Sequence, residues 1–173
     1  MKRSDIQPLP EYFDRYINLA DDIELIDALE KSLDNLNKLP LDKWNAIGDK
    51  VYAPGKWTIK DIVQHITDTE RIFSYRALRF ARNDSTKLPG FEESDFAREA
   101  KASRRSLTDL LEELKLVRRS TIVLFASFDN ETLQRKGPTF KKDISVLGIG
   151  FTTVGHQVHH FNILEERYYP LLG

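Results

Sequence analysis

Four histidines are the residues of this sequence best suited to catalytic chemistry, and they stand at His65, His156, His159 and His160. Neutral imidazole is a common ligand for zinc, nickel, cobalt and iron. His156 and His160 are four residues apart, so on a helix their side chains lie one turn above the other and can bind one ion. Gln157 occupies the position of the glutamate in an HExxH helix, so the pair does not form that motif.

His65 could supply a third imidazole from a different helix, because it precedes His156 by 91 residues. A catalytic zinc site uses three protein ligands and leaves a further position for water or substrate. His65 falls at the margin of an apolar helical stripe, where it is expected to face a groove that solvent reaches. His159 is expected to point away, toward Asn162 and Glu166. Spacing alone leaves a second interpretation open, in which each histidine is an ordinary hydrogen-bonded helix residue.

The composition excludes several kinds of chemistry. The chain has no cysteine, which excludes disulfides, thiolate metal sites and cysteine nucleophiles. Its 26 basic and 27 acidic residues give a net charge of −1, so no nucleic acid and no anionic membrane is expected as a partner. No glycine-rich phosphate loop and no serine nucleophile elbow is present.

Apolar periodicity predicts four long helices that would carry the histidines. With 173 residues, the chain fits a single domain, residues 1–173, with residues 1–20 as a peripheral N-terminal extension. The predicted long helices span residues 21–38, 58–83, 103–128 and 143–169. Thr58 and Asp61 resemble a capping box at the start of the second of these. Since no strand pattern is evident, the predicted fold class is all-α, a four-helix bundle.

Two of these helices have distinctive surfaces. The last is apolar nearly all round, which places it centrally. Its segment 144–164 has no charged residue and reaches the length of a membrane span, but three histidines and several other polar residues favour a buried helix of a soluble protein. The third helix carries charged residues of both signs that are expected to face solvent: Arg104, Arg105, Glu112, Glu113, Lys115, Arg118 and Arg119.

A few further residues are candidates with two interpretations each. Asp68 and Glu70 could support His65 through hydrogen bonds, or they are exposed helix acids. Trp44 and Trp57 are expected in the core or in the wall of the site. Four arginines follow His65 on the same helix and could bind an anionic cofactor, or they are ordinary surface residues: Arg71, Arg76, Arg79 and Arg82.

The ordered set of motifs is similar to one known family. Trp57-Thr58 with His65-Ile66, then Gly155-His156 with His160, then Glu166-Arg167-Tyr168 resembles the DinB/YfiT-like family of metal-dependent proteins. The resemblance covers about residues 20–170. It implies a four-helix bundle with up-down-down-up topology and a divalent metal, zinc or nickel. The three family ligands would fall on His65, His156 and His160, with His159 as a neighbour that does not bind the ion.

The resemblance also implies an activity. Some members are similar to thiol S-transferases of the bacillithiol type, in which the metal binds a small thiol as thiolate that attacks an electrophile; a related hydrolase is the second enzymatic expectation. The expected partners are therefore a small-molecule thiol or electrophilic substrate, and the family is compatible with a homodimer. The alternative is a bundle without turnover, which binds metal or ligand or serves stress-linked interactions. A cytoplasmic location is expected, and catalytic and thiol-binding residues stay unassigned.

Overall fold

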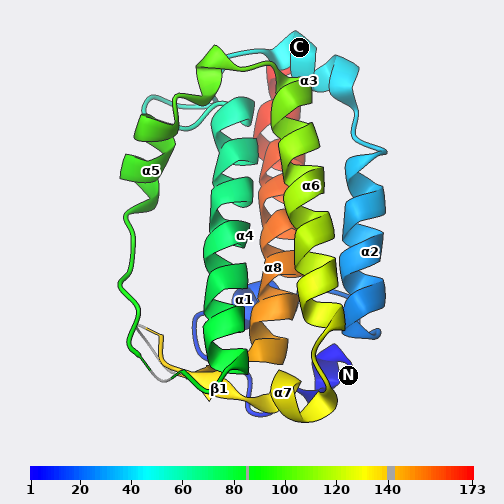
Figure 1. Ribbon diagram of the computed structural model, residues 1–173. Coiled ribbons are helices and arrows are strands. Elements are labelled where there is room, and N and C mark those ends of the chain that lie inside the picture. The colour runs from blue at the N-terminus through cyan, green and yellow to red at the C-terminus, as the bar shows by residue number, and fades with distance from the viewer. Residues whose placement is uncertain (85, 140–142) are drawn as a thin grey trace.

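The fold is built from four long helices that lie side by side (Figure 1). The computed structural model describes residues 1–84, 86–139 and 143–173. The long helices are α2 (Leu25–Leu36), α4 (Ile59–Ala81), α6 (Leu107–Ala126) and α8 (Val146–Ile163). The predicted all-α class and four-helix bundle are confirmed.

The long helices do not simply alternate in direction. In Figure 1, α4 and α6 run from the end of the bundle near α3 (Leu41–Ile47) toward the opposite end, whereas α2 and α8 run the other way. Two consecutive helices that run in the same direction need a long connection. That connection follows the outside of α4 and includes α5 (Glu93–Ala100) and the 3₁₀ turn η2 (Ala102–Arg104).

Side-chain caps define where three of the long helices begin. The backbone N–H of Asp61 donates to Thr58 Oγ1 at 3.2 Å, and Asp61 accepts from the Thr58 backbone in return, so the predicted capping box is present. Ser106 caps α6 and Ser145 caps α8, each through a side-chain oxygen that accepts from the backbone N–H three residues later. Each cap satisfies a backbone N–H that the helix itself leaves unpaired.

Short elements complete the bundle. The N-terminal segment contains η1 (Arg3–Asp5) and α1 (Asp14–Ile17), and the chain ends with a π turn, η3 (Leu164–Tyr168), and a 3₁₀ turn, η4 (Tyr169–Leu172). Between α6 and α8 lie α7 (Asn130–Gln134) and an antiparallel pair of two-residue strands, β1 (Lys136–Gly137) and β2 (Ile144–Ser145), which the sequence did not predict. Strands this short are fixed by their surroundings, so periodicity has nothing to detect.

The N-terminal segment is not peripheral, contrary to the sequence-based expectation. Ile6, Phe13 and Ile17 are buried and belong to the apolar core, and α1 packs directly against α8. Only one turn of α1 is helical, which is too short for an apolar stripe to be recognised in the sequence.

Among the described residues, the core contains two apolar clusters separated along the bundle axis. One includes Leu29 of α2, Ala77 of α4 and Phe125 of α6, and the other includes Leu36, Ile66 and Leu114 of the same three helices. Buried polar side chains occupy the intervening level on all four helices: Ser32, His65, Thr69, Glu70, Arg118, Thr121, His156, Gln157 and His160. Polar groups buried together in this way need partners within the protein, and this layer contains the candidate site.

Within the described ranges, no helix is long and apolar enough to cross a membrane.

Candidate metal centre

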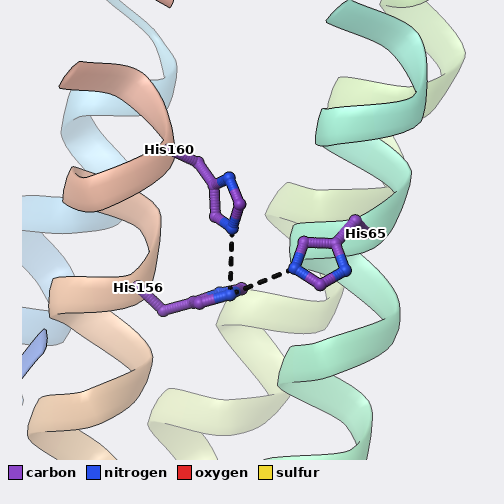
Figure 2. Close-up of side chains that lie close together, drawn as sticks. All are labelled: His65, His156 and His160. Carbon is purple, nitrogen blue, oxygen red and sulfur yellow. Dashed lines mark hydrogen bonds between the residues drawn. The ribbon is translucent and has the colours of Figure 1, made fainter. Parts of the chain in front are cut away.

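Three histidines meet in the polar layer between α4 and α8 (Figure 2). The Nε2 atom of His156 lies 3.2 Å from Nε2 of His65 and 3.1 Å from Nε2 of His160. All three side chains are buried, with exposed fractions of 4% for His65, 5% for His156 and 9% for His160. His65 is therefore not at a solvent-reached margin as expected, because Trp57 covers it with ring centroids 4.7 Å apart.

Hydrogen bonding alone cannot satisfy this cluster. A ring nitrogen of neutral imidazole carries either one hydrogen or one lone pair in the ring plane. Since Nε2 of His156 faces two other Nε2 atoms, it cannot form a good hydrogen bond with both. A metal ion would use all three lone pairs, and two nitrogen ligands on tetrahedral zinc lie about 3.3 Å apart for bonds of about 2.05 Å. The two separations from His156 match this value, and all three ligand atoms lie within 4.8 Å of one another.

Burial keeps the three imidazoles in the neutral form that binds metal. Desolvation lowers the pKa of His65 to about 4 and the pKa of His160 to about 3. For His156, burial lowers the pKa well below its ordinary value, and the neighbouring histidines and Arg118 lower it further. All three rings are therefore uncharged at neutral pH.

His159 lies beside the cluster without joining it. Its ring packs edge-on against the ring of Tyr16, with the two centroids 5.3 Å apart, rather than pointing toward Asn162 and Glu166. Tyr16 also contacts His156 at 5.3 Å, so α1 covers this side of the cluster. Tyr16 is not identifiable from the sequence by periodicity. The available signal is Gly155, because a residue without a side chain permits the close approach of another segment.

The hydroxyl of Thr69 contacts Nδ1 of His65, the ring nitrogen that does not face His156. Thr69 Oγ1 lies 3.5 Å from Nδ1 of His65, one helical turn away on α4. A hydroxyl that accepts a hydrogen bond from Nδ1–H leaves the lone pair on Nε2, where the other two histidines converge. Thr69 was not identified from the sequence, although the i, i+4 spacing permits this contact.

Neither acidic candidate near His65 contacts the cluster. Asp68 accepts a hydrogen bond from Gln64 at 2.9 Å, and burial raises its pKa. Glu70 is not an exposed helix acid, since its side chain is 2% exposed and forms a two-point ion pair with Arg118.

Arg118 is buried, contrary to the sequence-based expectation. The sequence placed it on the solvent face of the third predicted helix, but its side chain is completely buried. Nε and Nη2 donate to the two carboxylate oxygens of Glu70 at 2.8 and 2.9 Å, and Nη1 donates to Ser32 Oγ. Helical periodicity cannot reveal this pair, because its partners lie on different helices.

A cavity of about 730 Å³ opens beside the cluster, between α1, α4, α8 and the segment before α5. His156 and Thr69 line one part of its wall, and the aromatic rings of Tyr16 and Phe73 line more of it. Of the three clustered histidines, His156 lines this cavity, so the cavity adjoins the cluster.

The four arginines of α4 differ in their surroundings. Arg71 pairs with Glu113 at 2.6 Å, and Arg79 pairs with Asp84. Arg82 is exposed, whereas Arg76 is half-buried and lines the cavity. Trp44, as expected, is a core residue, 2% exposed.

Comparison with known proteins places this arrangement in a family. The family model of the DinB superfamily matches residues 24–164. The chain belongs to the DinB superfamily. The match includes the three histidines of the cluster, and the resemblance found in the sequence is confirmed. Among curated proteins, none matches this sequence.

A solved structure shares the DinB superfamily fold seen here. It is YfiT from Bacillus subtilis, a probable metal-dependent hydrolase with an unusual four-helix bundle topology. The TM-score is 0.68, and the match covers 93% of this chain and 88% of YfiT. At 16% sequence identity, the likeness establishes the shared fold.

Proposed function

We propose that this protein is a metal-dependent enzyme that activates a small nucleophile at a divalent ion held by His65, His156 and His160. The observation that carries the proposal is the convergence of three buried, neutral imidazoles beside a cavity of about 730 Å³. A divalent ion in such a site lowers the pKa of a bound thiol or water, so that the nucleophile forms near neutral pH. Zinc and nickel are the ions we expect.

A catalytic role is favoured over a structural one by the composition of the cluster. In the parts of the chain that the structure describes, the cluster contains three histidines and no carboxylate. Structural zinc sites are usually closed by four protein ligands, whereas catalytic sites have three. The chain's own residues would hold the ion, exclude bulk water through Trp57 and Tyr16, and admit the substrate from the cavity.

We propose thiol S-transfer as the leading reaction, with the thiol supplied by a small molecule. The chain has no cysteine, so a thiol nucleophile has to come from outside the protein. The thiol would release its proton to solvent, its sulfur would form a bond to an electrophilic carbon of the second substrate, and the leaving group would depart from that carbon with the bonding electron pair. Small thiols are kept reduced in the cytoplasm, where we therefore place the activity.

Hydrolysis is the second candidate, and the fold of YfiT favours it, since that protein is a probable metal-dependent hydrolase. The same site would then activate water in place of a thiol.

Metal analysis of untagged protein tests the common basis of both reactions. We expect close to one equivalent of zinc or nickel in the wild type, and loss of most of it in His160→Ala. His159→Ala is the matched control, because its ring adjoins His160 but lies outside the cluster. Equal metal content in all three proteins, or less than about 0.2 equivalents in the wild type, would contradict the proposal.

A turnover assay separates the reactions. Small thiols are screened with a chloro-nitro-aromatic electrophile, and an activated ester is used to detect hydrolysis. Turnover that requires added thiol and disappears in His65→Ala supports S-transfer. Thiol-independent ester cleavage that depends on His65 supports hydrolysis, and metal binding without either activity supports a binding bundle without turnover.

A further inference from the structure

Arg76 occupies an unusual position for an arginine of this protein, in the wall of the cavity beside the metal centre. Its side chain is half-buried, and Nη2 donates to the backbone carbonyl of Pro89 at 2.7 Å. Four other partly or fully buried arginines each pair with a carboxylate: Arg79, Arg105, Arg118 and Arg135. Arg3, also partly buried, donates to the backbone carbonyl of Asn18 and lies outside the cavity lining. Within the described chain, no Asp or Glu pairs with Arg76.

The guanidinium of Arg76 therefore carries a charge that the protein only partly compensates. Burial lowers the pKa of Arg76, and among the described residues no neighbouring charge opposes this effect. A guanidinium nevertheless stays protonated at neutral pH. A half-buried cation without a counter-charge gains free energy when an anion binds to it, and its planar donors match a carboxylate.

The position of Arg76 relative to the histidines sets the shape of such a ligand. Thr69, Phe73 and Arg76 are spaced by four and three residues, so they share one face of α4, and all three line the cavity. The rise from Thr69 to Arg76 is about 10 Å at 1.5 Å per residue. Thr69 contacts His65, and the rise along α4 from His65 itself to Arg76 is about 16 Å over 11 residues.

The other described residues of the wall favour an apolar body with a single negative charge. Aromatic and aliphatic side chains contribute much of the lining, among them Tyr12, Phe73, Phe91 and Ile149. Glu92 and Glu93 also line the cavity and are exposed. Their negative charges disfavour a polyanion such as a polyphosphate.

We propose that Arg76 is the carboxylate-recognition residue of the cavity, and that the ligand is an elongated apolar or aromatic monocarboxylic acid whose other end reaches the histidine cluster. The inference deepens the proposed function by naming the class of its substrate. Carboxylate binding at Arg76 does not itself require the metal.

Binding of model acids tests this inference without any assay of turnover. The probes are ω-phenylalkanoates with two to six methylene groups, each compared with its primary amide, which has the same shape without the charge. Binding is measured by titration calorimetry with zinc-loaded and with EDTA-treated protein. We expect at least one acid to bind ten-fold or more tightly than its amide in both forms.

Two variants test whether Arg76 causes the preference for the acid over the amide. Arg76→Gln is expected to lose the ten-fold preference for the acid while binding the amide within two-fold of wild type. Arg82→Gln is the matched control, since Arg82 is exposed at the end of the same helix and lies outside the cavity lining. It should keep the preference.

Four results would overturn the inference. The first two are the absence of acid binding throughout the series and an acid preference that survives in Arg76→Gln. The others are an acid preference that requires the metal and equally tight binding of the corresponding phenylalkylamine. Metal content is measured on the same samples, so that failure of the Arg76 inference can be distinguished from failure of the proposed metal centre. Protein that binds metal but shows no acid preference refutes only the present inference, and protein with the preference but no metal refutes only the metal centre.

Discussion

Gly155 on α8 lies directly against the backbone carbonyl of Tyr16, so closely that a Cβ atom at position 155 would be 1.8 Å from that oxygen. This close approach places the ring centroid of Tyr16 5.3 Å from the ring centroid of His156, the residue that follows Gly155. The glycine therefore allows the N-terminal segment to cover the histidine cluster. A methyl group cannot be accommodated by rotating a side chain, because the opposing atom belongs to the backbone.

Gly155→Ala should consequently destabilise the protein, although alanine favours helix by about 1 kcal/mol over glycine. We expect a net loss of about 1–3 kcal/mol in the free energy of unfolding, measured by urea denaturation, because overpacking forces the backbone to shift. Gly90→Ala is the control, since a Cβ there meets no atom within 4 Å and the change should stay within about 0.5 kcal/mol. Equal stability of Gly155→Ala and wild type would show that α1 does not pack here.

The buried ion pair of Glu70 and Arg118 leads to a second prediction. Removing one partner leaves the other charged and buried, so Glu70→Gln and Arg118→Met should each lower the free energy of unfolding by about 3–5 kcal/mol. The double variant should lose much less than the sum of the two, because it leaves no unpaired charge.

An exposed ion pair provides the comparison for this cycle. Arg98 and Asp95 pair at 2.8 Å on α5 with both side chains more than half exposed, so Arg98→Ala should cost less than about 1 kcal/mol. Additive losses for Glu70→Gln and Arg118→Met would argue against direct pairing in solution.

Stability of the metal-free protein should fall on mild acidification. The folded state holds the pKa of His65 at about 4 and that of His160 at about 3, whereas an unfolded histidine titrates near 6.5. Between these values the unfolded chain binds more protons than the native protein, so the free energy of unfolding rises with pH. Acidification from about pH 6.5 to pH 5 therefore destabilises the fold.

The slope of this pH dependence is measurable by urea denaturation in EDTA. Each histidine that is protonated only on unfolding adds up to about 1.4 kcal/mol per pH unit. Because His65→Gln removes one of these histidines, it should reduce the slope by up to about 1.4 kcal/mol per pH unit. Carboxylates with lowered pKa values interfere little in this window, because they lose their contribution only near pH 4 and below. A flat profile above pH 5 would contradict burial of the neutral rings.

The parts of this molecule that follow from local sequence could be predicted, and those that depend on contacts between elements could not. The long helices, the Thr58 cap and the one-turn spacing of His156 and His160 are encoded within short segments. Convergence of His65 on that pair depends on how α4 packs against α8, which spacing does not determine. For the same reason periodicity placed Arg118 on the surface, although Glu70 on another helix pairs with it in the interior.

The contact between Thr69 and His65 supports a final prediction about metal affinity. Thr69→Val keeps the side-chain volume but removes the oxygen that lies 3.5 Å from Nδ1 of His65. The ring then loses the partner that holds its orientation, and the affinity for zinc should fall about ten-fold, measured by competition with a chromogenic chelator. Thr67→Val is the matched control, because it also removes a buried hydroxyl from α4, one that donates to the carbonyl of Val63 rather than contacting a histidine. Its zinc affinity should match wild type. Equal losses in the two variants would attribute the effect to general destabilisation of α4, and no loss in either would show that Thr69 does not orient His65.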